Sequence, residues 1–269
     1  MSKKDIVFRD LLLLGNFPGR RVVGLGARIP DAGPSLVRVI QELVKRGLNP
    51  LSVEAAPNSA NPSELSLLAF IDMGGVDEGV LRDLTSELES SKIISSPKIL
   101  TTPIPGVIGD TYSDYKGFLR FRALVIGEPA LTGFLRGLYQ TFGEAGAVFL
   151  YHAGKSIGVT AARIHSDTLN VRERDMMYRG AELFFRALGY VRSLSLNREE
   201  GKTVTAVLTD NLECSLLRDI KRPPTCQWVR GMIEGIVEVF EGGRYESEEV
   251  ECINMGGSSC KILLRPASR

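Results

Sequence analysis

The chain is poor in the residues and motifs from which catalytic sites are usually built. Its 269 residues include only two histidines, His152 and His165, and neither has metal-ligand spacing or a nucleophile beside it. No G-x-S-x-G, phosphate-binding loop or H-E-x-x-H motif is present. Gly24-Leu-Gly26 follows a predicted strand, but Ile29 stands where a dinucleotide-binding loop needs its third glycine. These absences favour a binding protein over an enzyme.

Charge of one sign and long apolar runs are also missing. The formal net charge is +1, and no run of basic residues marks a nucleic-acid or acidic membrane surface. No stretch approaches the roughly 20 apolar residues that span a bilayer. The first eight residues resemble a signal peptide, but Arg9 and Asp10 interrupt the apolar run. We therefore expect a cytoplasmic protein with reduced cysteines that binds neither membranes nor nucleic acid directly.

The chain is long for a single core, and its two halves differ in pattern. We predict an α+β protein with an N-terminal extension over 1–20, a first domain over 21–100, a linker over 101–116 and a second domain over 117–269. The proline-rich and polar composition of Thr101–Lys116 indicates the linker.

The first domain has the pattern of a ferredoxin-like βαββαβ plait. Alternating apolar residues predict strands, apolar stripes predict two helices, and Pro97 suggests that the last strand lies at an edge. Asp77 is the expected cap of the second helix. The expected elements are a strand at 21–29, a helix from 34, a strand around 51–55, a loop at 57–63, a strand at 65–73, a helix over 77–88 and a strand at 92–100.

The element order and the turn Asp31-Ala-Gly-Pro34 resemble ACT domains. This resemblance implies a small regulatory module that pairs across a homodimer and binds an amino acid near the turn, with Asp31 and Gly33 at the family's turn position. The alternative is a plait whose turn only caps a helix and binds no ligand.

The second domain is predicted to mix helices and two hairpins. Thr225 is the expected cap of the helix that begins at Cys226. Residues 147–151 fit either a helix or a strand. The expected elements are a helix near Pro129 with Leu131, Phe134, Leu135, Leu138 and Phe142 buried, a helix with Met177, Ala181, Phe184, Phe185 and Leu188 inward, a hairpin over 190–209, a helix over 212–220, the helix 226–240 and a hairpin over 245–264.

Three cysteines of this domain, with one glutamate, form a candidate metal site. Cys226, Cys252 and Cys260 follow the pattern C-x25-C-x7-C, and Glu249 precedes the second cysteine by three residues. Three thiolates and a carboxylate fill a zinc tetrahedron and leave no position for water or substrate. The alternative is scattered buried thiols. Cys214 falls outside the pattern and is expected to be a small buried residue.

The glutamate is ambiguous. In a regular strand Glu248 shares a face with Cys252, whereas Glu249 lies opposite. Either a β-bulge re-aims Glu249, or Glu248 is the fourth ligand.

Residues from about 123 to 264 resemble a 4-vinyl-reductase (4VR) domain. The resemblance rests on Ile126–Tyr139, Phe142–Gly146, Cys226-x4-Gly231-x3-Gly235 and Glu249-x-x-Cys252 with Cys260. The family includes sensor domains of phenol-responsive transcription activators, whose zinc is held by three cysteines and a glutamate at similar spacing. It therefore implies a structural zinc held by Cys226, Glu249, Cys252 and Cys260.

The resemblance also implies a pocket for a small hydrophobic molecule, for which Tyr151, His152, Phe184 and Trp228 are candidate lining residues. In the phenol sensors a tryptophan before the first cysteine holds the effector, whereas Trp228 follows Cys226, which argues against a phenol. Our leading hypothesis is a non-catalytic, ligand-responsive regulatory protein. The alternatives are a tetrapyrrole-handling reductase or carrier and a scaffolding subunit, since 4VR domains resemble subunits of vesicle-tethering complexes.

Overall fold

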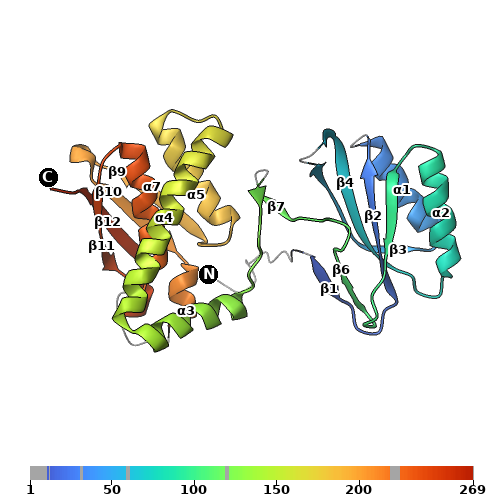
Figure 1. Cartoon of the computed structure of the whole chain (residues 1–269), viewed down its shortest axis with the longest axis horizontal. Helices are drawn as coiled ribbons and strands as arrows, with labels where there is room; N and C mark the ends of the chain where they lie inside the picture. Colours follow the sequence, from blue (N-terminus) through green and yellow to red (C-terminus); the bar gives the residue numbers. More distant parts are fainter. Residues whose placement is uncertain are drawn as a thin grey trace. The chain divides into compact units, whose positions relative to one another are not determined.

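The computed structural model describes residues 11, 13–30, 33–58, 61–118, 121–218 and 225–268, without the side chains of residues 58, 62, 165 and 200. The chain forms two compact units, Met1–Leu124 and Val125–Arg269. Each unit combines helices with antiparallel sheet (Figure 1), which confirms the predicted α+β class. Among the described helices, none is both long and apolar enough to cross a membrane.

The first unit is built on a four-stranded antiparallel sheet in the order β3-β4-β2-β5. The βαββαβ order is the predicted one, and β5, which contains Pro97, lies at the sheet edge where a missing N–H is tolerated. The elements are β2 (Val22–Ile29), α1 (Pro34–Lys45), β3 (Asn49–Asn58), β4 (Asn61–Asp72), α2 (Glu78–Ser90) and β5 (Ser95–Leu100).

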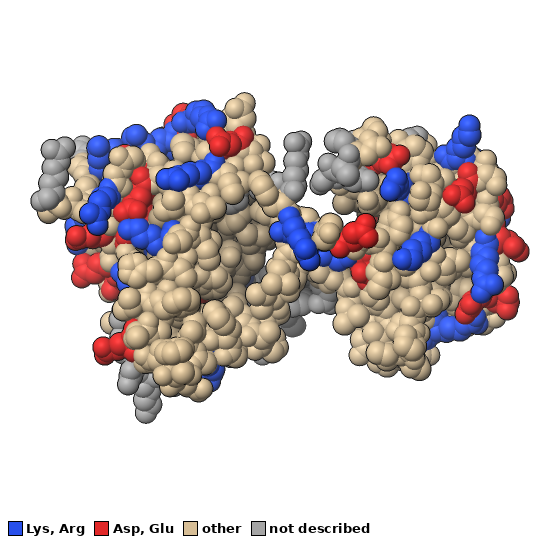
Figure 2. Space-filling view, viewed as in Figure 1, with Lys and Arg blue, Asp and Glu red and all other residues tan. Residues whose placement is uncertain are grey.

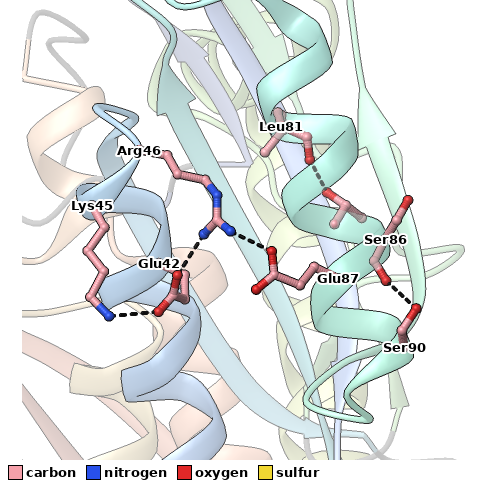
Figure 3. A network of polar contacts seen from close by, with 8 residues as sticks. Glu42, Lys45, Arg46, Leu81, Ser86, Glu87 and Ser90 are labelled. Carbon is pink, nitrogen blue, oxygen red and sulfur yellow. Dashed lines mark hydrogen bonds and ion pairs between the residues drawn. The ribbon is translucent and has the colours of Figure 1, made fainter.

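Helices α1 and α2 pack on one face of this sheet (Figure 1). Alternate residues of the two central strands, such as Leu25 and Ile71, point into this core and are fully buried. The predicted cap is present, since Asp77 accepts the backbone N–H of Gly79 at 2.7 Å. Arg46 of α1 joins the two helices by ion pairs with Glu42 and Glu87 (Figure 3).

The opposite face of the sheet is covered by segments that were expected to be an extension and a linker. Strand β1 (Leu14–Asn16) pairs with β6 (Val107–Gly109), and Ile108 packs against Phe70 of β4. Tyr112 lies so close to Gly26 that an added Cβ would be 2.2 Å from its ring. The glycine pair Gly24 and Gly26 therefore serves this close packing, because Leu100 crowds the other glycine in the same way.

Two boundaries of the first unit differ from expectation. Strands β3 and β4 continue through the expected loop at 57–63, because their backbone pairing extends to Asn58 and Asn61. The unit also extends past the expected linker to Leu124, and includes the short pair β7 (Gly117–Phe118) and β8 (Phe121–Arg122). The polar and proline-rich composition of 101–116 reflects turns around β6, so composition alone placed the boundary too early.

The second unit packs helices against the antiparallel sheet β11-β12-β10-β9. Both predicted hairpins are present, and the undecided segment 147–151 is part of a long helix, α4. The elements are α3 (Glu128–Phe142), α4 (Glu144–Thr168), α5 (Arg174–Ala187), β9 (Ser193–Arg198), β10 (Val204–Thr209), α6 (Leu212–Leu216), α7 (Gln227–Glu241), β11 (Tyr245–Glu251) and β12 (Cys260–Pro266), with short 3-10 turns at Glu200–Lys202 and Ile253–Met255.

Helices α4 and α7 touch through their backbones. A Cβ on Gly231 or Gly235 of α7 would lie 2.1 or 2.3 Å from a carbonyl oxygen of α4. A Cβ on Gly154 or Gly158 of α4 would lie 2.1 or 2.0 Å from a carbonyl oxygen of α7. Such distances admit no side chain, so the glycines at four-residue spacing set how closely the two helices pack.

Some expected buried faces are rotated. On α3, Leu131, Leu135 and Tyr139 are buried, whereas Phe134 and Phe142 are more than half exposed. On α5, Tyr178 is buried while Leu188 is partly exposed. The apolar stripes were wider than the contacts available, so tertiary packing selected one edge of each. On the face drawn in Figure 2, acidic and basic side chains are interspersed.

Candidate metal centre and apolar pocket

Four cysteines of the second unit meet at one buried point. Cys214 comes from α6, Cys226 precedes α7, Cys252 follows β11 and Cys260 begins β12. All four side chains are fully buried, and their sulfurs lie with an oxygen of Glu249 within 4.8 Å of one another. Elements that are separate in the sequence thus bring five possible metal ligands together.

Most of the sulfur separations match a metal tetrahedron. Cys226 and Cys252 are 4.0 Å apart, and Cys214 is 3.7 Å from both Cys252 and Cys260. Four thiolates at the zinc–sulfur distance of about 2.3 Å would be about 3.8 Å apart. The exception is the pair Cys214 and Cys226, whose sulfurs are 2.6 Å apart.

A β-bulge turns Glu249 towards the cysteines. The pairing of β11 with β12 shifts register between Glu249 and Glu251, so Glu249 lies opposite the buried Ile262. Glu248 points away and forms an ion pair with Arg265, with 64% of its side chain exposed. The structure therefore brings Glu249, and not Glu248, into the cluster.

The carboxylate of Glu249 is only half satisfied. Its Oε2 accepts the backbone N–H of Cys226 at 3.4 Å, whereas its Oε1 is buried without a hydrogen-bond partner. Burial, together with the neighbouring Cys252, raises the pKa of Glu249 to about 8. A buried orphan oxygen beside thiols is the arrangement that a bound cation would satisfy. The donor set fits a metal ion, and its sulfur-rich chemistry fits zinc.

Polar groups around the cysteines support their sulfurs. The side-chain amide of Asn211 lies 3.1 Å from the Cys226 sulfur and 3.4 Å from that of Cys214, and it donates to both. The hydroxyl of Thr225 lies 3.5 Å from the Cys214 sulfur. Donors of this kind stabilise thiolate charge and orient ligands around a metal.

The start of α7 is capped by a residue that the sequence did not indicate. Cys226 occupies the cap position without a side-chain bond, so the expected Thr225 cap is absent. Glu213 of α6 instead accepts the N–H groups of Trp228 and Val229, each at 2.9 Å. Burial raises the pKa of Glu213 to about 8. The cap comes from 15 residues upstream, a distance at which local sequence patterns carry no signal.

Cys214 is the fifth donor, and the sequence pattern missed it. Its expected burial is correct, but its sulfur lies among the other three. It precedes Cys226 by 12 residues, outside any paired-cysteine motif. Only the fold of α6 against the β11–β12 turn places it there, since Asn254 of that turn donates to the backbone carbonyl of Cys214.

An apolar pocket lies between α4, α5 and α7, with about 370 Å³ of space that is partly open to solvent. Phe184, one of the expected lining residues, contributes to its wall. The pocket is lined by Ala162, Ser166, Leu169, Val171, Met176, Met177, Gly180, Ala181, Phe184, Ile236 and Phe240.

The other expected ligand-binding residues lie elsewhere. The hydroxyl of Tyr151 hydrogen-bonds to the buried Glu234, and its ring packs against the guanidinium of Arg230. His152 is exposed, and Trp228 packs against Tyr190 with ring centres 5.7 Å apart. In the first unit Gly33 is the N-cap residue of α1, and Asp31 lies outside the described residues.

Comparison with known protein families assigns the sheet and metal-donor region. Residues 205–266 match the 4VR domain family. This stretch contains four of the five donors and begins nine residues before the fifth is reached, so all five lie within it. The match confirms the resemblance over that part of the second unit. None of the curated proteins matches the chain significantly.

Solved structures with a similar fold include two sensor or enzyme-family proteins and one trafficking subunit. The phenol-responsive sensory domain of the transcription activator PoxR, bound to phenol, is 21% identical, with a TM-score of 0.48 over 54% of this chain and 77% of that one. A trafficking protein particle complex subunit 3 from Naegleria fowleri, covalently bound to palmitic acid, is 16% identical, with a TM-score of 0.40 over 52% and 95%. A vinyl-4-reductase family protein from Methanocaldococcus jannaschii is 14% identical, with a TM-score of 0.38 over 54% and 85%. We draw no functional conclusion from likeness at this level.

Proposed function

We propose that the second unit is a ligand-sensing 4VR domain that a structural zinc holds together, and that the protein is regulatory and not catalytic. The observation that carries this proposal is the buried donor set, in which protein ligands can fill every position of a tetrahedral ion. Cys226, Cys252, Cys260 and Glu249 would hold the zinc, in agreement with their spacing. An ion enclosed in this way stabilises the fold and leaves no site for water or substrate.

The ligand would bind away from the metal, in the apolar pocket. Helix α7 begins beside the cysteines at Cys226, and its residues Ile236 and Phe240 line the pocket. At 1.5 Å per residue these two regions of the helix are about 15 Å apart or more. Helix α7 therefore connects a rigid metal-bound end to a ligand-bound end.

The pocket wall favours a small uncharged ligand. Ser166 is the one polar side chain among the lining residues, and its hydroxyl already donates to the carbonyl of Ala162 at 2.8 Å. Leu169 and Met176 are about half exposed at the rim, where flexible apolar side chains can adapt to a guest. A charged ligand would lose its hydration without gaining a partner.

The first unit would act as a regulatory module of the ACT kind. Its βαββαβ order supports this role, and an amino acid bound near the 31–34 turn and pairing into a homodimer are parts of the same proposal. The ligand would shift the population between two arrangements of the protein, to the extent that it binds one of them more tightly.

Native mass spectrometry of gently purified full-length protein tests the proposal, because it measures metal, ligand and subunit number together. We expect one zinc per chain and a co-purifying small molecule. Titration of toluene and phenol by calorimetry then tests the pocket in Ala181→Trp, which fills it, and in Leu183→Trp, which adds the same side chain to an exposed position of α5.

Ala181→Trp should weaken binding of both probes by at least on the order of tenfold, whereas Leu183→Trp should bind them as the wild type does. A wild-type chain that binds neither probe, carries no ligand and has no zinc would contradict the proposal. Equal binding by the two variants would place the ligand elsewhere and contradict the pocket assignment.

A further inference from the structure

The metal centre has five donors, whereas a structural zinc takes four. The sequence pattern accounts for Cys226, Glu249, Cys252 and Cys260. It leaves Cys214, a fully buried thiol with its sulfur inside the cluster, without a role.

Cys214 has the position of a ligand. Its sulfur lies 3.7 Å from those of Cys252 and Cys260, the separation of about 3.8 Å that two thiolates adopt on one tetrahedral zinc. The amide of Asn211 and the hydroxyl of Thr225 both donate to it. A thiol packed only as an apolar residue would have no use for two such donors.

The crowding of Cys214 shows where it competes. Its sulfur is 2.6 Å from that of Cys226, which is longer than a disulfide bond of about 2.05 Å and shorter than the separation of two zinc ligands. Movement of one sulfur by about 1.2 Å would restore the tetrahedral spacing. Cys226, Cys252 and Cys260 already take three positions, so the fourth is contested by Cys214 and Glu249.

We propose that Cys214 is a second occupant of the fourth metal position and exchanges there with Glu249. The proposal rests on metal binding by the cysteine cluster. When Cys214 binds, its thiol gives its proton to solvent and the carboxylate of Glu249 leaves the ion, so the charge of the centre is the same in both forms.

The exchange would change which element the metal holds. With Glu249 bound, the ion is attached to the bulge of β11, whereas with Cys214 bound it is attached to α6. Helix α6 also caps α7 through Glu213 and receives the side chain of Arg136 from α3, which donates to the carbonyl of Leu216 at 3.2 Å. The choice of ligand therefore decides whether α6 or the β11 bulge is the freer element.

Cobalt substitution of the full chain provides the test, because thiolate-to-cobalt charge-transfer absorption grows with the number of bound thiolates. The variants are Glu249→Gln, Cys214→Ser and the double variant, with Glu248→Gln as the matched control on the outer face of the same strand. Glu249→Gln should keep one ion per chain with absorption about one third higher than Cys214→Ser, in proportion to the thiolate count. The wild type and the control should lie between the two.

The double variant should bind the metal more weakly than either single variant, by at least on the order of tenfold. Equal absorption in Glu249→Gln and Cys214→Ser would overturn the exchange, as would a Glu249→Gln chain that binds cobalt as weakly as the double variant. X-ray absorption at the zinc edge of the wild type requires no variant. More than three sulfurs per zinc on average would support the exchange, and three sulfurs with one oxygen would overturn it. A wild type without zinc would refute the metal proposal itself.

Discussion

The two units of this protein solve the problem of burying a core in different ways. In the first unit two amphipathic helices cover one sheet face and a short strand pair covers the other, so its core is apolar throughout. The second unit buries four thiols and the carboxylates of Glu213, Glu234 and Glu241 within or beside its core. The first can be stable through apolar burial alone, whereas the second needs partners for its buried polar groups. The predictions below challenge this difference.

The largest effect is expected from removing the metal. Cys252→Ser, or a strong chelator, should abolish stoichiometric zinc binding and unfold the second unit, because structural zinc contributes about 10–16 kcal/mol and a domain is stable by only about 5–15 kcal/mol. Metal analysis and amide hydrogen exchange measure the two effects. Protection in the first unit should persist. A metal-free chain whose second unit keeps its protection would show that apolar burial suffices there too.

The next effect concerns the α4–α7 contact. Gly235→Ala should destabilise the second unit by about 3 kcal/mol, because the new Cβ would lie 2.3 Å from the carbonyl oxygen of Lys155 and force the helices apart. The matched control is Gly133→Ala on α3, where nothing lies within 4 Å. That control should stabilise by about 0.5–1 kcal/mol. Denaturant unfolding measures both, and equal signs for the two variants would refute the close backbone contact.

A smaller effect is expected from a buried ion pair. Lys155→Met leaves the carboxylate of Glu234 buried without its cation, 2.7 Å away in the wild type. The cost should be about 2 kcal/mol, below that of a fully buried pair because 26% of the lysine side chain is exposed. Lys98→Met, an exposed lysine of the first unit, should cost little. Similar losses in the two variants would mean that the buried pair contributes nothing special.

The same pair predicts a pH dependence. Burial would raise the pKa of Glu234, but hydrogen bonds from Lys155, Ser247 and Tyr151 outweigh it and lower that pKa. The carboxylate therefore contributes stability that is present above its unfolded pKa of 4.5 and is lost as the pH falls through the lowered folded value. The stability gap between wild type and Lys155→Met should narrow over that acidic range. A gap that does not change from about pH 7 to about pH 3 would contradict the assignment.

The smallest effect belongs to the surface of the first unit. Glu87→Gln removes one partner of Arg46 between α1 and α2 (Figure 3) and should change stability by less than about 1 kcal/mol, because the carboxylate is 58% exposed. Thermal unfolding at low and high salt measures it. A loss as large as that of Lys155→Met would show that the first unit also depends on charge pairing.

Much of the architecture could be predicted from local patterns. The alternation of Leu67, Ala69, Ile71 and Met73 indicated a strand with one face in the core, and all four are fully buried. Asp77 announced the start of α2 and caps it as expected. Boundaries were less predictable, because the turns of 101–116 have the composition of a linker while Ile108 packs against the sheet.

The sequence by itself determined the helices and strands, the apolar faces of the first unit, and the spacing of Cys226, Glu249, Cys252 and Cys260, because these depend on periods and intervals along the chain. Only the tertiary structure decided that Glu249 and not Glu248 faces the cysteines, since a bulge had to shift the register of β11. It also decided that Cys214 joins the cluster, that Glu213 caps α7, and that the pocket lies towards the far end of that helix. The physical reason is that these relations join residues on different elements, and no local period records which elements the fold brings together.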